Sequence, residues 1–131
     1  MSASPRLHPS DLLRFAAIAF LLLEGGIHLQ QYEGPLNPVP TISTLFVLNA
    51  VAAAAISLAL AASRRHVAVL AALAGLGLTL GALVSLAISR ASVLFDYTEP
   101  TLRAGVTFAL VAELGAVLAL SGFLFAWLRE R

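Results

Sequence analysis

The sequence predicts an all-α polytopic membrane protein, a single domain of four transmembrane helices bundled together, with the N and C termini cytoplasmic. Hydrophobic residues make up 60% of the 131 residues and charged residues only 11%, against roughly 25% charged residues in soluble domains. The mean hydropathy is +0.92. Four apolar stretches each approach the ~20 residues that a helix needs to cross the hydrocarbon core of a bilayer.

The helices are expected at residues 11–32, 41–62, 67–89 and 104–128. Three prolines within residues 33–40 exclude a helix there, because proline lacks an amide donor and fixes φ. Residues 63–66 are expected to form a tight turn, and residues 90–103 the longest loop. A cleaved signal peptide is the alternative for the first stretch, but no A-x-A-like cleavage site follows it.

The arginines predict the orientation in the membrane. Six of the eight fall on the side that holds the termini, and all eight basic residues are arginine. The arginine-rich side of a membrane protein stays cytoplasmic. The absence of lysine and the heavy use of alanine, glycine and leucine suggest a GC-rich bacterial genome, so we expect a multi-pass protein of the bacterial inner membrane. Trp127 is then expected at the inner interface, and Tyr32, Phe95 and Tyr97 are expected at the outer one.

Polar residues inside the predicted spans form one layer. Glu24 and His28 lie on the first span, and the later spans each supply one residue, namely Asn49, Thr79 and Glu113 in that order. With a rise of 1.5 Å per residue, Glu24 and the three later residues all come roughly 10–14 Å below the outer face. Because lipid offers no hydrogen-bond partner, these side chains are expected to converge inside the bundle. Gln31 and Tyr32 continue the polar stripe outward.

Three interpretations of this layer remain open. It can be a polar lock that only specifies packing, a site that binds or transports a proton, an ion or a small ligand, or a small enzyme's active site. Glu24, His28 and Glu113 are the candidate metal ligands, since two carboxylates and an imidazole suit iron, manganese or zinc. The Glu24-x-x-x-His28 spacing differs from the paired Glu-x-x-His motifs of di-metal bundles.

Several function classes are excluded or unsupported. The chain has no cysteine, which excludes disulfides, thiolate catalysis and cysteine metal sites. A net charge of +1 leaves no basic patch for nucleic acid. No nucleophile elbow, phosphate-binding loop or H-E-x-x-H motif occurs, so the sequence indicates neither a reaction nor a cofactor.

Small residues recur at every fourth position of the third span. They are Gly77, Gly81, Ser85 and Ser89. Such a row lets helix backbones approach closely, in this case within the same bundle. The alternative is a contact with a second copy or with a larger membrane complex, to which the protein is then an accessory subunit.

One run of residues resembles a known group of proteins. The residues that carry the resemblance are Gly25-Gly26-Ile27-His28-Leu29, Pro40-Thr41-Ile42, Phe46 and Asn49. They are similar to those of small four-helix inner-membrane proteins of GC-rich bacteria, a group with no assigned activity. The resemblance implies the same fold and location, and it assigns no catalytic residue.

Overall fold

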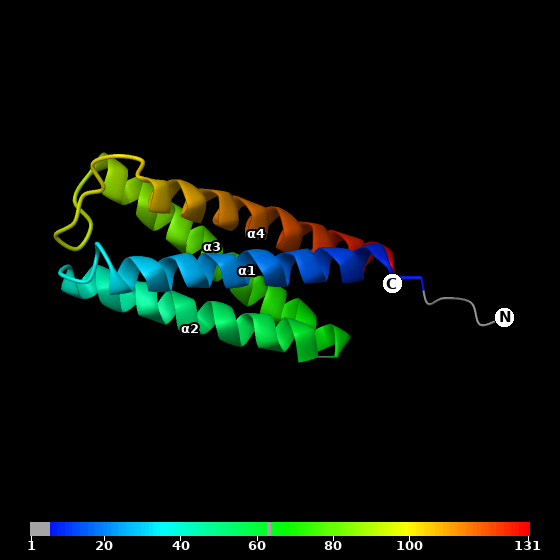
Figure 1. Cartoon of the computed structure of the whole chain (residues 1–131). Helices are drawn as coiled ribbons and strands as arrows, with labels where there is room; N and C mark the ends of the chain where they lie inside the picture. The colour runs from blue at the N-terminus through cyan, green and yellow to red at the C-terminus, as the bar shows by residue number, and fades with distance from the viewer. Residues whose placement is uncertain (1–5, 63) are drawn as a thin grey trace.

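The computed structural model describes residues 6–62 and 64–131, and within them the chain forms four long helices (Figure 1). They are α1 (Pro9–Glu33), α2 (Pro40–Ala62), α3 (Arg65–Ala91) and α4 (Ala104–Arg129). Each begins and ends within two residues of its predicted bounds. All four are long and apolar enough to cross a membrane, which confirms the all-helical fold class.

The helices run alternately up and down, so α1 begins and α4 ends at the same end of the bundle (Figure 1). Helix α1 packs against α2 and α4, and α3 packs against the same two helices. Hydrogen bonds close the end that holds the termini. The Ser10 hydroxyl donates to Glu130 Oε2 at 2.6 Å, and Arg65 Nη2 donates to the same oxygen at 2.9 Å.

The connections at the two ends differ in length. Helix α3 begins at Arg65, so the predicted turn over residues 63–66 is too long, and Ser63 lies outside the described residues. At the opposite end, the α3–α4 loop contains a tight turn in which Leu94 and Tyr97 exchange both backbone hydrogen bonds. Its central residues, Phe95 and Asp96, have φ values of 48° and 61°, which is a left-handed conformation that non-glycine residues seldom adopt.

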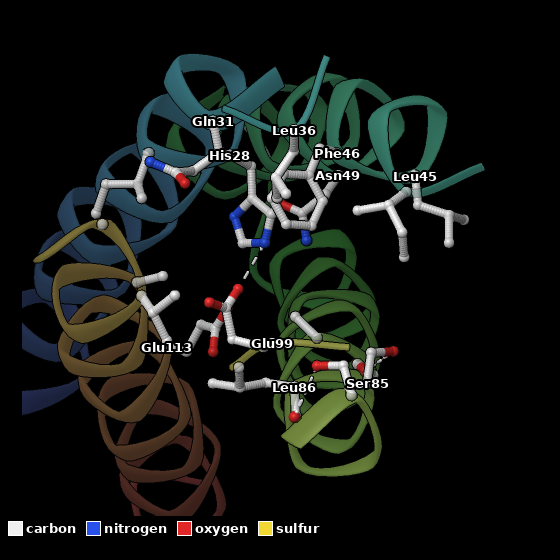
Figure 2. A pocket seen from close by; sticks show the side chains of 18 of the residues that line it. His28, Gln31, Leu36, Leu45, Phe46, Asn49, Ser85, Leu86, Glu99 and Glu113 are labelled. Carbon is white, nitrogen blue, oxygen red and sulfur yellow. Dashed lines mark hydrogen bonds and ion pairs between the residues drawn. The ribbon is translucent and has the colours of Figure 1, made fainter. Parts of the chain in front are cut away.

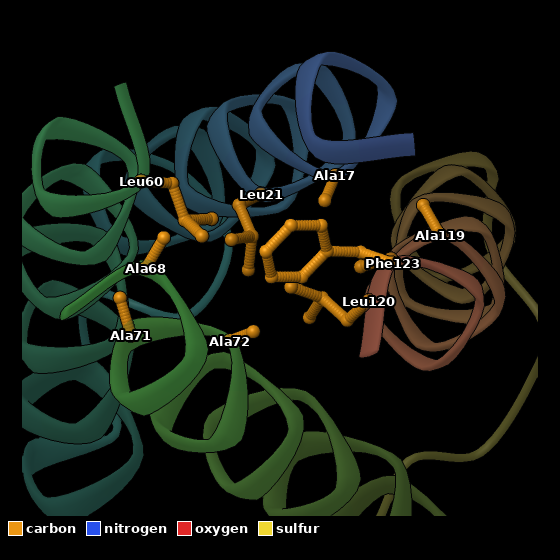
Figure 3. Packing of buried hydrophobic residues seen from close by; sticks show 10 residues of the cluster. Ala17, Leu21, Leu60, Ala68, Ala71, Ala72, Ala119, Leu120 and Phe123 are labelled. Carbon is orange, nitrogen blue, oxygen red and sulfur yellow. The ribbon is translucent and has the colours of Figure 1, made fainter. Parts of the chain in front are cut away.

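The apolar core fills the half of the bundle nearest the termini (Figure 3). Leu21, Leu60 and Leu120 are fully buried there, between alanines that bring the helices close together. The outer surface is apolar too, and Leu118 is 74% exposed. A soluble protein covers such a surface with charge, so the exposed leucines suit contact with lipid.

The glycines that allow close helix packing are not those of the predicted ridge. A Cβ added to Gly25 would lie 3.0 Å from the Cβ of Ala53, and one added to Gly115 would lie 2.4 Å from the ring of Phe20. A Cβ on Gly77 or Gly81 would meet nothing within 4 Å. The expectation that the third-span ridge packs within the bundle is therefore wrong at these two positions.

The predicted interfacial tryptophan lies in the last turn of α4 and faces inward. Trp127 is only 8% exposed. Its ring lies beneath the guanidinium of Arg131, 4.1 Å from the ring centroid, and contacts His66 edge-on. Trp127 therefore packs into the end of the bundle, and its position at a membrane interface stays a prediction.

Candidate functional site

Glu24 lies at the centre of the polar layer, with no exposed surface. Asn49 Nδ2 donates to its Oε1 at 3.1 Å, and the Thr79 hydroxyl donates to its Oε2 at 2.8 Å. These donors come from α2 and α3, so one carboxylate joins three helices. Both side-chain oxygens of Glu24 therefore accept a hydrogen bond from another helix.

His28 lies one turn further along α1, with its ring fixed from two sides. Its Nδ1–H donates to the backbone carbonyl of Glu24 at 2.9 Å, because a carbonyl oxygen can only accept. The ring of Phe46 packs edge-on against it, with 4.6 Å between centroids. This arrangement leaves Nε2 with a free lone pair, which points toward Glu113 (Figure 2).

Glu113 brings α4 into the same cluster. Its Oε1 lies 3.6 Å from His28 Nε2, and the residue is only 2% exposed. Glu24, His28 and Glu113 each offer a ligand atom within 4.8 Å of the other two. Among the described residues, Glu113 Oε2 and Asn49 Oδ1 are buried with no hydrogen-bond partner. The expected convergence of the polar layer is therefore present, and it includes acceptors that are still unsatisfied.

A cavity of about 370 Å³ lies above this cluster, toward the loops (Figure 2). Helices α2 and α3 diverge at this end (Figure 1). The walls are mostly apolar, with polar groups of His28, Asn49 and Glu113 at one end. Leu48 of α2 and Gly81 of α3 line the cavity and are exposed, so it reaches the surface between these two helices.

A charged network borders the cavity on the loop side. Arg103 donates two hydrogen bonds to the carboxylate of Glu99, each 3.0 Å long, and a third to Gln31 Oε1 at 2.9 Å. The Tyr97 hydroxyl donates to Glu99 at 2.5 Å. Burial acts to raise the pKa of Glu99, but the hydrogen bonds from Arg103 and Tyr97 outweigh it and hold the pKa below its usual value.

The structure divides the predicted site residues into groups. Thr79 lies behind Glu24, outside the cavity lining, and Gln31 lies at the loop side beside Arg103. Tyr32 is half-buried and does not line the cavity. The expectation that it belongs to the site is therefore not supported by its position, since it lies one residue further around α1 than Gln31.

Other lining residues were not predicted as parts of a site. Tyr97, Glu99 and Arg103 come from the loop, where the only available signal was the i,i+4 spacing of Glu99 and Arg103. Gly81, Ser85 and Ser89 line the cavity on α3. Three members of the small-residue row thus form part of the cavity wall, where a contact between helices was expected.

Comparison with known proteins gives no family for this chain. No family model, no curated protein and no solved structure matches it. The resemblance to small inner-membrane proteins stays a prediction, and the side-chain arrangement is the basis for a functional proposal.

Proposed function

We propose that this chain is an integral protein of the bacterial inner membrane, with both termini in the cytoplasm. The lengths of the four helices and the apolar outer surface support insertion into a bilayer. Six of eight arginines lie at the end that holds the termini, or beside the α2–α3 connection at the same end. The positive-inside rule assigns that end to the cytoplasm.

Its function, in this proposal, is to bind a small, largely apolar molecule that enters from the bilayer and carries a polar head. The observation that carries this is a pair of buried oxygens, Asn49 Oδ1 and Glu113 Oε2, that have no hydrogen-bond partner among the described residues and lie at one end of an apolar cavity. A head group with O–H or N–H donors satisfies both, and the apolar walls take the rest of the molecule. Entry from the lipid phase follows from the opening between α2 and α3.

A pair of glycine substitutions tests the proposal. Gly81 lines the cavity and Gly77 does not, although both are exposed and a Cβ added to either would meet nothing within 4 Å. Gly81→Leu is expected to fill the opening without touching the polar cluster. Gly77→Leu adds the same side chain one turn away and serves as the matched control.

Each delipidated protein is reconstituted with a total lipid extract of the expressing cells and then examined by native mass spectrometry in detergent. We expect one retained molecule per chain for the wild type and for Gly77→Leu, and at least tenfold less for Gly81→Leu. Absence of a retained molecule on the wild type, or equal retention by all three proteins, refutes the proposed function.

A further inference from the structure

The buried cluster below the cavity has the spacing of a mononuclear metal site. Bonds of about 2.0–2.2 Å to nitrogen and oxygen place neighbouring ligands of a tetrahedral ion roughly 3.3–3.6 Å apart. His28 Nε2 and Glu113 Oε1 are 3.6 Å apart. The ligand atoms of the three residues all lie within 4.8 Å of one another, so a shift of about an ångström closes them around one ion.

The groups behind these atoms are also arranged as in metal sites. Metal-binding histidines usually donate their second ring N–H to a carbonyl or carboxylate, which fixes the tautomer and the ring orientation. His28 does this through Nδ1 to the carbonyl of Glu24. Thr79 and Asn49 each occupy one lone pair on the carboxylate of Glu24, so each of its oxygens keeps a lone pair for a cation.

A shared proton accounts less well for the same geometry. An N–H···O hydrogen bond is about 2.7–3.2 Å long, and the gap between His28 and Glu113 exceeds this. Glu113 Oε2 has no partner among the described residues. Two carboxyl groups are thus buried beside one imidazole, and a divalent cation bound among them would compensate for their negative charge once they lose their protons.

We propose that Glu24, His28 and Glu113 bind one divalent first-row transition-metal ion, such as Zn²⁺ or Mn²⁺, with an open coordination position toward the cavity. One imidazole and two carboxylates form a donor set of this class. The metal site goes beyond the proposed function, because it lies at the buried end of the cavity and its test uses the ion alone, without any lipid ligand.

The test needs a protein without a histidine tag. Purified chain is stripped with a chelator, incubated with Zn²⁺, passed through a desalting column and assayed for bound zinc. We expect about one ion per chain. Glu113→Gln and His28→Gln each remove one ligand and are expected to weaken binding at least tenfold. Glu99→Gln and His66→Gln make the same chemical changes outside the cluster and are expected to keep full binding.

A second measurement separates lost ligands from lost folding. Co²⁺ replaces Zn²⁺ in the wild type, where a four- or five-coordinate site gives much stronger visible absorption than the hydrated ion. Circular dichroism and gel filtration check that each variant keeps its fold. No zinc on the wild type, unchanged zinc in well-folded Glu113→Gln and His28→Gln, or a Co²⁺ spectrum identical to that of the hydrated ion overturns the proposal.

Discussion

The hydrogen bond from Thr79 to Glu24 offers a direct measure of what the polar layer contributes to stability. Thr79→Val keeps the branched shape of the side chain and removes only the donor. Thr79 and Glu24 are both fully buried, so water cannot replace the lost hydroxyl. Glu24 Oε2 then loses the one side-chain donor it has in the structure, at 2.8 Å.

The expected cost follows from the burial of the acceptor. A buried acceptor left without its donor costs about 1–3 kcal/mol. The free energy of unfolding is therefore expected to fall by about 1–3 kcal/mol, which raises the unfolding equilibrium constant about 5- to 150-fold. Asn49 still donates to the other oxygen of Glu24, so the cluster keeps part of its connection.

Titration of the detergent-solubilised protein with dodecyl sulfate, followed by circular dichroism, measures this free energy. Thr107→Val is the matched control, because Thr107 is exposed and its hydroxyl donates to the carbonyl of Arg103, the residue that precedes its own helix. The control is expected to change stability by no more than about 0.5 kcal/mol. Equal effects of the two substitutions would show that Glu24 does not depend on Thr79.

Three further predictions concern packing, pH and orientation. Gly25→Ala should lower the free energy of unfolding by about 1–3 kcal/mol, because the added methyl group overpacks against α2. Gly26→Ala is the control, since its methyl group meets open space, and equal unfolding curves for the two variants would contradict the prediction. The lowered pKa of Glu99 means that its stabilisation of the α3–α4 loop is complete above its unfolded-state pKa of about 4.3 and is lost as the pH falls through the folded-state value. The protection of that loop against hydrogen exchange, relative to the intrinsic rate at each pH, should fall in acid but not in Glu99→Gln, and protection that does not change with pH would refute this. A cysteine replacing Asp96 should react with an impermeant thiol reagent added outside cells and one replacing Arg131 should not, and the reverse pattern would invert the topology.

The helices could be predicted closely because length and hydropathy leave little freedom. A span must cover the hydrocarbon core, and the proline-rich residues 33–40 cannot continue a helix. The polar layer was predictable for a related reason. Depth follows from the helical rise, so Glu24, Asn49, Thr79 and Glu113 had to reach one level, and lipid cannot solvate them there.

The sequence carried less information about which way each helix faces. Protein interior and lipid are both apolar, so the sequence does not distinguish a helix face that packs from one that lies on the surface. Gly77 and Gly81 have the spacing of glycines in a helix contact, yet they lie on the surface. The loop was also not predictable, because its position depends on long-range bonds. Glu99 N–H donates to the Ser89 carbonyl at 2.8 Å, and Arg103 reaches Gln31 on α1. No periodicity in residues 90–103 indicates these contacts.

In the proposed membrane topology, the partners of Glu24 become available one after another during biosynthesis. Helix α1 is the least apolar of the four, with a mean hydropathy of 1.7, and it is made first. A carboxyl group at mid-bilayer costs about 2.5–3.5 kcal/mol on insertion scales. Asn49 follows 25 residues later and Thr79 follows 55 residues later. Helix α2 therefore supplies a donor for one carboxyl oxygen of Glu24, and α3 then supplies a donor for the other. A nascent chain ending at Ala62 should therefore lose α1 from the membrane more readily than one ending at Ala91, which a glycosylation reporter at the N terminus can measure. In this scheme the first helix is stabilised in the bilayer by donors from α2 and α3, which follow it along the chain.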